Sequence, residues 1–166
     1  MARVFILAYG NPMRCDDGLA WHASDQLTGK FPVAEVEILR LHQLAPELSE
    51  TIRYAEAVIF VDAASAEGSS PGEVRCQEVL PESTARFSHH LSPGAVLALA
   101  RQLYGAIPRA YSVTLTGECF DHGESLSTAV EAALPTLVAR IESLVQQTRA
   151  QQRPSSGAFP PASRKP

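Results

Sequence analysis

The feature that most constrains the fold is a pair of short runs made only of apolar residues, residues 4–8 and 57–61. Runs of this length with no alternating polar residue are typical of strands buried on both faces, as at the centre of a parallel sheet. Parallel strands need long crossover connections, and the chain has segments of helical periodicity between its strands. The sequence therefore predicts an α/β fold.

Periodicity and turn residues place the other elements. We expect a three-layer α/β sandwich whose five-stranded sheet is mostly parallel, with helices on both faces and one antiparallel edge strand. Pro135 is expected to divide the last helix by opening its main part. The predicted strands are 3–9, 34–41, 57–61, 73–79 (the edge strand) and 110–116, and the predicted helices are 17–28, 45–54, 93–105 and 127–148.

The length of 166 residues suits a single domain, which we place at residues 1–148. Residues 149–166 are rich in Gln, Pro, Ser and Ala, and we expect them to form a disordered tail because they have too little apolar surface to bury. The net charge of −4 and the lack of a long basic run argue against nucleic-acid binding. No apolar run is long enough for a membrane span.

Three cysteines, Cys15, Cys76 and Cys119, are widely spaced, and none forms a CxxC pair. This pattern predicts neither a disulfide framework nor a zinc ribbon, and it favours a reducing cytoplasm. Cys15 stands directly before two aspartates, so like charge should disfavour its thiolate. We therefore do not expect a nucleophilic cysteine at this position.

A loop rich in turn residues follows the first strand and contains Gly10, Asn11, Asp16 and Asp17. Loops at the carboxyl ends of parallel strands are the usual ligand sites in open α/β sheets. Both aspartates can act as capping or first-turn residues of the following helix. In the alternative, Asp16 caps the helix and shapes the loop, and Asp17 points into the cleft as a metal ligand or acid/base.

Asp62 follows the third strand, and a histidine pair, His89 and His90, precedes the third helix. The carboxyl ends of parallel strands share one sheet edge, so Asp17 and Asp62 are expected to converge there. Two carboxylates and one imidazole can hold a divalent first-row metal with positions left open. The alternatives are that Asp62 is a turn residue and that the histidines face solvent.

Five segments together resemble the hydrogenase maturation endopeptidases, in the same order along residues 3–145. They are Gly10-Asn11-Pro12 with Asp16-Asp17-Gly18, His42-Gln43-Leu44-x-Pro46-Glu47-Leu48, Val61-Asp62-Ala63, His89-x-Leu91-Ser92-Pro93, and Leu115-Thr116-Gly117-Glu118-x-Phe120.

The resemblance implies a cytoplasmic endopeptidase, of the aspartic or metal-dependent type, which removes the C-terminal extension of a nickel-iron hydrogenase large-subunit precursor after nickel insertion. It assigns metal binding and catalysis to Asp17, Asp62 and His89, with His89 preferred to His90 by the His-x-Leu spacing. The nickel would be carried by the substrate, with no tightly bound cofactor of the protein's own. Asn11, Asp16, His42 and His90 are expected to support the site, and we expect a monomer.

Two other functions fit the same residues. One is a nickel-binding accessory protein that escorts the precursor without cutting it, and the other is a different hydrolase on the same scaffold. The sequence contains neither a GxSxG nucleophile elbow nor an HExxH zinc motif, so the bond-breaking step is left open.

Overall fold

The computed structural model of this chain describes residues 3–83 and 91–151. Its sheet has the strand order β2-β1-β3-β5-β4, and only β4 runs antiparallel to its neighbour. The predicted mostly parallel five-stranded sheet with one antiparallel edge strand is confirmed. The strands are β1 (Val4–Tyr9), β2 (Val36–Leu41), β3 (Ala57–Ala64), β4 (Val74–Glu78) and β5 (Arg109–Thr116).

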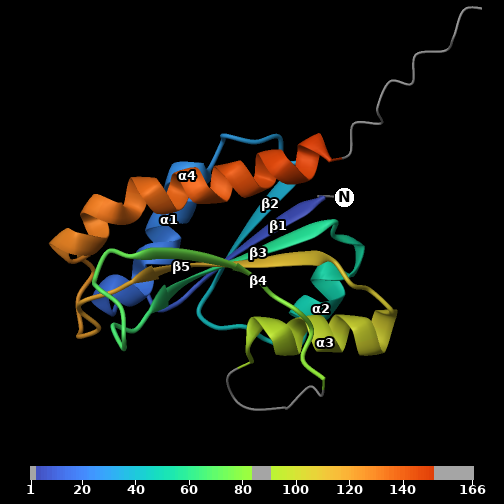
Figure 1. Cartoon of the computed structure of the whole chain (residues 1–166), viewed down its shortest axis with the longest axis horizontal. Helices are drawn as coiled ribbons and strands as arrows, with labels where there is room; N and C mark the ends of the chain where they lie inside the picture. Colours follow the sequence, from blue (N-terminus) through green and yellow to red (C-terminus); the bar gives the residue numbers. More distant parts are fainter. Residues whose placement is uncertain (1–2, 84–90, 152–166) are drawn as a thin grey trace, which may run out of the picture.

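Helices cover both faces of the sheet, as predicted for a three-layer sandwich. Figure 1 shows α1 and α4 on one face and α2 and α3 on the other. The helices are α1 (Leu19–Leu27), α2 (Leu48–Thr51), α3 (Pro93–Tyr104) and α4 (Thr128–Ala150), with short 3-10 turns η1 (Cys15–Gly18) and η2 (Ile52–Tyr54).

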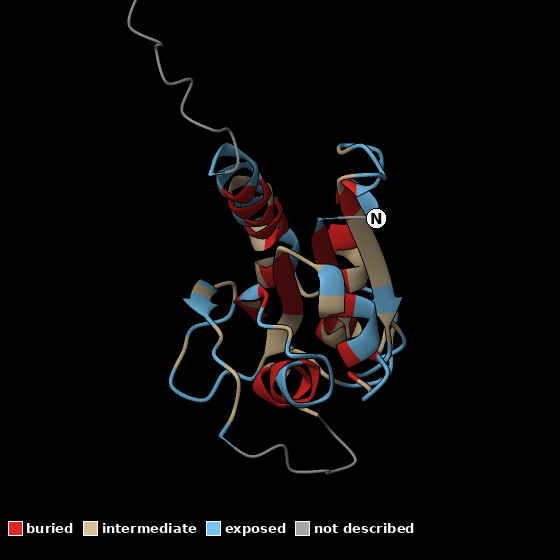
Figure 2. Cartoon of the chain, turned by 90° about the vertical axis from the view of Figure 1, so that its right-hand side faces the viewer, coloured by how far each residue is buried: buried red, intermediate tan, exposed pale blue. Residues whose placement is uncertain are grey.

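The central strands β1 and β3 divide their side chains between two cores. Ile6 and Ile59 pack with residues of α1 and α4, whereas Leu7 and Phe60 pack with residues of α3. Successive residues of a strand point to opposite faces of the sheet. Because helices cover both faces, all four side chains are fully buried. Figure 2 shows the resulting buried centre between the helical layers. This packing explains why the two strand sequences lack polar residues.

Three predicted elements differ from the structure. The third strand continues to Ala64, because its pairing with β5 extends through Asp62↔Thr114 to Ala64↔Thr116. Asp62 therefore lies inside the strand and not beyond its end. The predicted helix 17–28 begins as the 3-10 turn η1, and the predicted helix 45–54 is only a four-residue helix followed by η2.

Pro135 does not divide the last helix, which runs unbroken from Thr128 to Ala150. Proline removes one backbone hydrogen bond from a helix, which leaves the carbonyl of Glu131 without its usual donor. Both residues are exposed, so water can take the place of that donor. Ser127 caps the helix as predicted, with its hydroxyl accepting from Val130 N at 3.4 Å.

Helix α4 includes the first residues of the predicted tail, Arg149 and Ala150. Residues 152–166 lie outside the described part of the chain. No helix within the described ranges 3–83 and 91–151 has the length and apolar character needed to cross a membrane.

Candidate active site

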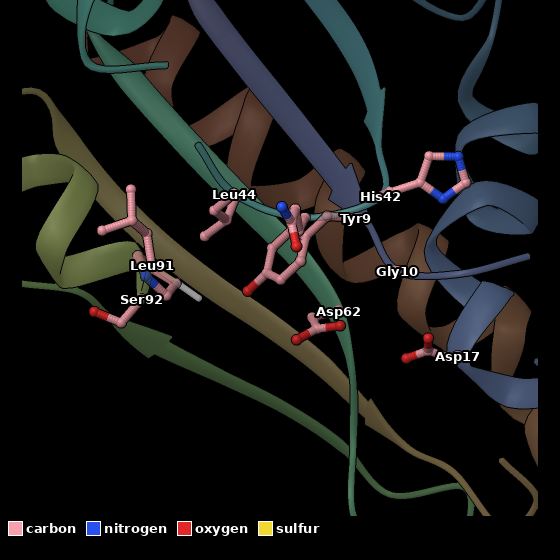
Figure 3. Close-up of a pocket in the computed structure, with 10 residues that line it drawn as sticks. Tyr9, Gly10, Asp17, His42, Leu44, Asp62, Leu91 and Ser92 are labelled. Atoms are coloured by element: carbon pink, nitrogen blue, oxygen red, sulfur yellow. The ribbon is translucent and has the colours of Figure 1, made fainter. Parts of the chain in front are cut away.

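A cavity of about 530 Å³ opens at the carboxyl ends of β1 and β3. Its wall combines two carboxylates with aromatic, aliphatic and polar side chains drawn from four segments of the chain (Figure 3). The residues that line it are Tyr9, Gly10, Asp17, His42, Gln43, Leu44, Asp62, Leu91, Ser92 and Pro93. The sequence prediction that Asp17 and Asp62 reach the same sheet edge agrees with this arrangement.

Asp17 is held by the tight loop after β1. Its Oδ2 accepts a hydrogen bond from Asn11 N at 2.9 Å, and Asn11 Oδ1 accepts one from Met13 N at 2.9 Å. Gly10 has φ +137°, and a Cβ at this position would lie 2.0 Å from the backbone oxygen of Asp17. Only glycine fits both the conformation and the space. Gly10 and Asn11 therefore set where the Asp17 carboxylate lies.

Asp16 is fully buried and links this loop to the loop that follows β5. Its Oδ2 accepts from Glu118 N at 2.8 Å, Cys119 N at 2.9 Å and Ser127 Oγ at 2.7 Å, and its Oδ1 accepts from Ser127 N at 2.7 Å. Burial alone would raise the pKa of Asp16, but these hydrogen bonds outweigh it and hold the pKa below its ordinary value. The expected role in loop shape agrees with these contacts.

The expected capping role of Asp16 is wrong. The residue at the N-cap of η1 is Arg14, and no side chain caps that turn. Asp16 is inside the turn, and its carboxylate accepts from backbone and side-chain groups 102 to 111 residues away in sequence. The general preference of Asp for helix caps predicted that Asp16 would accept from the first turn of the helix that follows it. Its carboxylate accepts instead from backbone N–H groups of the loop after β5.

Asp62 faces the cavity beside Tyr9. Its Oδ1 accepts from Ala63 N at 2.8 Å, and its carboxylate is hydrogen-bonded to the Tyr9 hydroxyl. Burial is the main cause that raises the pKa of Asp62 to about 7, and the nearby Asp17 charge adds to this rise. The hydrogen bonds from Ala63 and Tyr9 oppose it. Burial and the Asp62 charge also raise the pKa of Tyr9 far above its usual range, so the phenol stays protonated as a donor.

Tyr9 was not identified as a site residue from the sequence. Figure 3 shows its hydroxyl directed toward Asp62, with the Asp17 carboxylate on the other side of Asp62. The signal that could have found it is its position as the last residue of β1, directly before Gly10. At that point a strand residue is already at the sheet edge where the site forms.

His42 lines the cavity, but its ring packs on Trp21, with ring centroids 5.3 Å apart. Trp21 is itself fixed by a hydrogen bond from its Nε1 to the carbonyl of Leu41 at 3.1 Å. Figure 3 shows the His42 ring at one end of the cavity, apart from both carboxylates. His42 therefore lies at the cavity wall, and its supporting role stays a prediction.

The two other predicted histidines, His89 and His90, lie outside the described residues. Among residues 3–83 and 91–151, no group of three His, Cys, Asp or Glu side chains could hold a metal ion. The described part of the chain thus contributes the carboxylate pair Asp17 and Asp62. Ser92, which caps α3 by accepting from Ala95 N at 3.0 Å, places the start of that helix at the cavity wall.

Asp17 and Asp62 are the two carboxylates of the cavity wall that could hold a divalent cation. Asp17 disfavours ionisation of Asp62, because two like charges line one partly buried cavity. A cation between them would remove this repulsion and favour the ionised form of both groups. Carboxylate oxygens are also ligands that nickel and other divalent metals accept.

Cys15 is half-buried and has a free thiol. A hydrogen bond with Cys119, burial, the Cys119 charge and the carboxylates of Asp16 and Asp121 raise the pKa of Cys15 to about 11. The prediction that neighbouring charge disfavours the Cys15 thiolate is confirmed, although Cys119 is the largest cause.

A family model described as hydrogenase maturation protease (HycI) matches residues 22–144, which is more than half of the chain. The matched stretch includes Asp62 and begins after Asp17. None of the curated proteins matches the sequence.

Several solved structures have a similar fold at 20–22% sequence identity. The hydrogenase maturating endopeptidase HybD from E. coli aligns with a TM-score of 0.74 and 21% identity over 88% of this chain and 93% of that chain. The [NiFe] hydrogenase maturation protease HybD from Thermococcus kodakarensis aligns with a TM-score of 0.63 and 22% identity, covering 86% and 99%. HycI from Thermococcus kodakarensis KOD1 gives 0.67 and 20%, covering 87% and 93%. At this identity the likeness demonstrates the fold alone.

Proposed function

Because the chain belongs to the hydrogenase maturation protease family, we propose that it cleaves the C-terminal extension from a nickel-iron hydrogenase large-subunit precursor that already holds nickel. The observation that carries the proposal is the pair of carboxylates, Asp17 and Asp62, that line one cavity at the carboxyl edge of the sheet. Such a pair is suited to recognising a metal ion that the substrate brings. The protein needs no tightly bound cofactor of its own in this scheme.

Charge gives a physical reason for discrimination between the two precursor forms. The Asp62 carboxylate is costly to ionise, because it is buried and faces Asp17. A precursor with nickel supplies the positive charge that offsets this cost, whereas a precursor without nickel leaves the repulsion in place. Binding of the nickel-loaded form is therefore favoured over binding of the nickel-free form.

The residues of the proposed site have separate tasks. Asp17 and Asp62 supply oxygen ligands, and the Tyr9 hydroxyl orients Asp62 by donating to it. His89 is proposed as the third ligand, on its sequence position two residues before Leu91, which lines the cavity. The aliphatic part of the wall, which includes Leu44, is suited to the side chains of a bound peptide.

We place the processing reaction in the cytoplasm and propose that the protein works as a monomer. The wide spacing of the three cysteines, with no CxxC pair, is the sequence feature that supports a reducing compartment. A sedimentation-velocity experiment on the purified chain tests the monomer proposal directly.

The function is tested by mixing the purified chain with nickel-loaded and nickel-free precursor and weighing the products by intact mass spectrometry. We expect a shortened large subunit only from the nickel-loaded precursor. Asp62→Asn and Asp17→Asn should leave the precursor at full length. Asp25→Asn is the matched control, because Asp25 is an exposed residue of α1 that pairs with Arg40 away from the cavity.

An unchanged precursor mass together with stable binding of the nickel-loaded form would identify an escort protein instead of a protease. Equal cutting of both precursor forms would contradict recognition through nickel. Cutting by both aspartate variants at the wild-type rate would contradict the assignment of the site.

A further inference from the structure

Two cysteines that are 104 positions apart in sequence lie together beside the loop that carries Asp17. The Cys119 side chain is near enough to that of Cys15 to be the main cause of the raised pKa of Cys15. Both thiols are free, and both residues are partly exposed, so a small reagent can reach them. The third cysteine, Cys76, is on strand β4, where it pairs with Val113 of β5.

The backbone fixes this proximity. Cys15 N donates to Gly123 O at 2.6 Å, Asp16 N donates to Cys119 O at 3.0 Å, and Cys119 N donates to the Asp16 carboxylate at 2.9 Å. The two segments also form an isolated parallel bridge, Arg14↔Gly123. The residue next to Cys15 is thus hydrogen-bonded directly to Cys119, which places the two cysteines at neighbouring positions on the two segments.

Further contacts hold both segments in place. Arg14 donates through Nε and Nη2 to the carbonyl of Phe120 at 3.2 and 3.0 Å. At Gly123 a Cβ would lie 3.0 Å from Cys15 Sγ, so the thiol is packed against that residue.

We propose that Cys15 and Cys119 are a redox-modification site that forms an intramolecular disulfide by exchange with a low-molecular-weight disulfide such as oxidised glutathione. Because the thiolate of Cys15 is disfavoured, the Cys119 thiol loses its proton to solvent and attacks the small disulfide first, which releases one small thiolate and leaves a mixed disulfide on Cys119. The second thiol loses its proton and attacks the protein sulfur of that mixed disulfide. The second small thiolate then leaves. In total, two protein thiols are oxidised and one small disulfide is reduced to two thiols.

The new bond would tie the Asp17 loop covalently to the loop after β5. It would close a chain segment of about 100 residues, a length at which a disulfide restricts the unfolded state strongly. It would also fix Cys15, which has φ +45° in the left-handed region that non-glycine residues seldom adopt. We expect the oxidised protein to melt at a temperature higher by about 5–15 °C.

The test is oxidation of the folded full-length chain with oxidised glutathione, alkylation of the remaining thiols, digestion and mass spectrometry. We expect a peptide pair joined through Cys15 and Cys119, with Cys76 alkylated, and full reversal by dithiothreitol. The Cys76→Ser variant is the matched control and should give the same joined pair. The Cys15→Ser and Cys119→Ser variants should instead retain one glutathione on the remaining partner.

Three results would overturn the proposal. They are independent glutathione addition to both Cys15 and Cys119 of the wild-type chain, a joined pair that contains Cys76, and a melting temperature that does not rise in the cross-linked protein. If a serine variant fails to fold, the mapping of the wild-type and Cys76→Ser proteins still decides the matter. Oxidation of the urea-unfolded chain should lose the preference for Cys15 with Cys119, because the folded backbone is what brings them together.

Discussion

Replacing Asp16 by asparagine is expected to destabilise the fold more than any other conservative change of a carboxylate in the loop. The Asp16 side chain is fully buried and accepts four hydrogen bonds, three of them at Oδ2. An asparagine is best placed with its carbonyl at Oδ2, which puts its NH₂ group against Ser127 N. That geometry keeps three bonds and turns the fourth into a contact between two donors.

The magnitude follows from these contacts. Three hydrogen bonds to a charged acceptor become neutral, which costs about 1 kcal/mol each. A buried donor without a partner costs about 1–3 kcal/mol more. Because contacts within one network are not additive, we expect a loss of about 3–5 kcal/mol in the free energy of unfolding. A domain of this size has about 5–15 kcal/mol in total.

The loss should depend on pH. The folded-state pKa of Asp16 lies below its ordinary value, so its ionised form stabilises the fold above the unfolded-state pKa. This stabilisation disappears as pH falls through the folded-state pKa. The difference in stability between wild type and Asp16→Asn should therefore be largest near neutral pH and should narrow below about pH 4.

Urea unfolding followed by circular dichroism measures this difference at a series of pH values. Asp121→Asn is the matched control, because Asp121 is exposed in the loop after β5 that Asp16 contacts and should change stability by less than about 0.5 kcal/mol. A neutral-pH loss for Asp16→Asn as small as that of the control would refute the reasoning. So would a loss that is the same at every pH.

The remaining predictions concern three other residues. Gly10→Ala should lower the free energy of unfolding by on the order of 3 kcal/mol or more, because its Cβ would lie 2.0 Å from the Asp17 carbonyl oxygen. Urea unfolding measures this loss, and a loss under about 1 kcal/mol would contradict the close approach of Gly10 to Asp17. Pro135→Ala should raise stability by about 1–3 kcal/mol, seen as a higher melting temperature, because it restores a helix hydrogen bond at an exposed site. The folded-state pKa of Asp62 is raised to about 7, so its ionisation lowers the free energy of unfolding as pH rises from about 4 to 7. Asp62→Asn should remove that decline. An unchanged dependence of stability on pH would show that the carboxyl is not buried as described.

The sheet could be predicted because the composition of its central strands is compatible with few positions in a fold. Strands as apolar as residues 57–61 fit only where both faces are covered, and crossover connections then fix the parallel order. Boundaries were harder, as β3 shows, because its last residues are kept in the sheet by pairing with β5 and not by their own composition. Pro135 was misjudged because propensity says nothing of whether a helix position faces water.

The candidate site could be predicted in outline only. Asp17 was found because it follows β1 and Asp62 because it lies near the carboxyl end of β3, and these strand ends share an edge. The partner of Asp16 could not be found, because it depends on how a loop 102 residues away folds back. The contact between Tyr9 and Asp62 likewise depends on which way a residue at the end of a strand points, and the contact between Cys15 and Cys119 depends on loop packing.

The central claim is that Asp17 and Asp62 together receive the nickel of the substrate. Anomalous diffraction at the nickel edge, from crystals of the full-length chain soaked in a nickel salt, tests it most directly. The account predicts a nickel peak between the two carboxylates in wild-type crystals, and no peak there in crystals of Asp62→Asn. Nickel bound elsewhere with the space between Asp17 and Asp62 empty, or an undiminished peak in the variant, would contradict it.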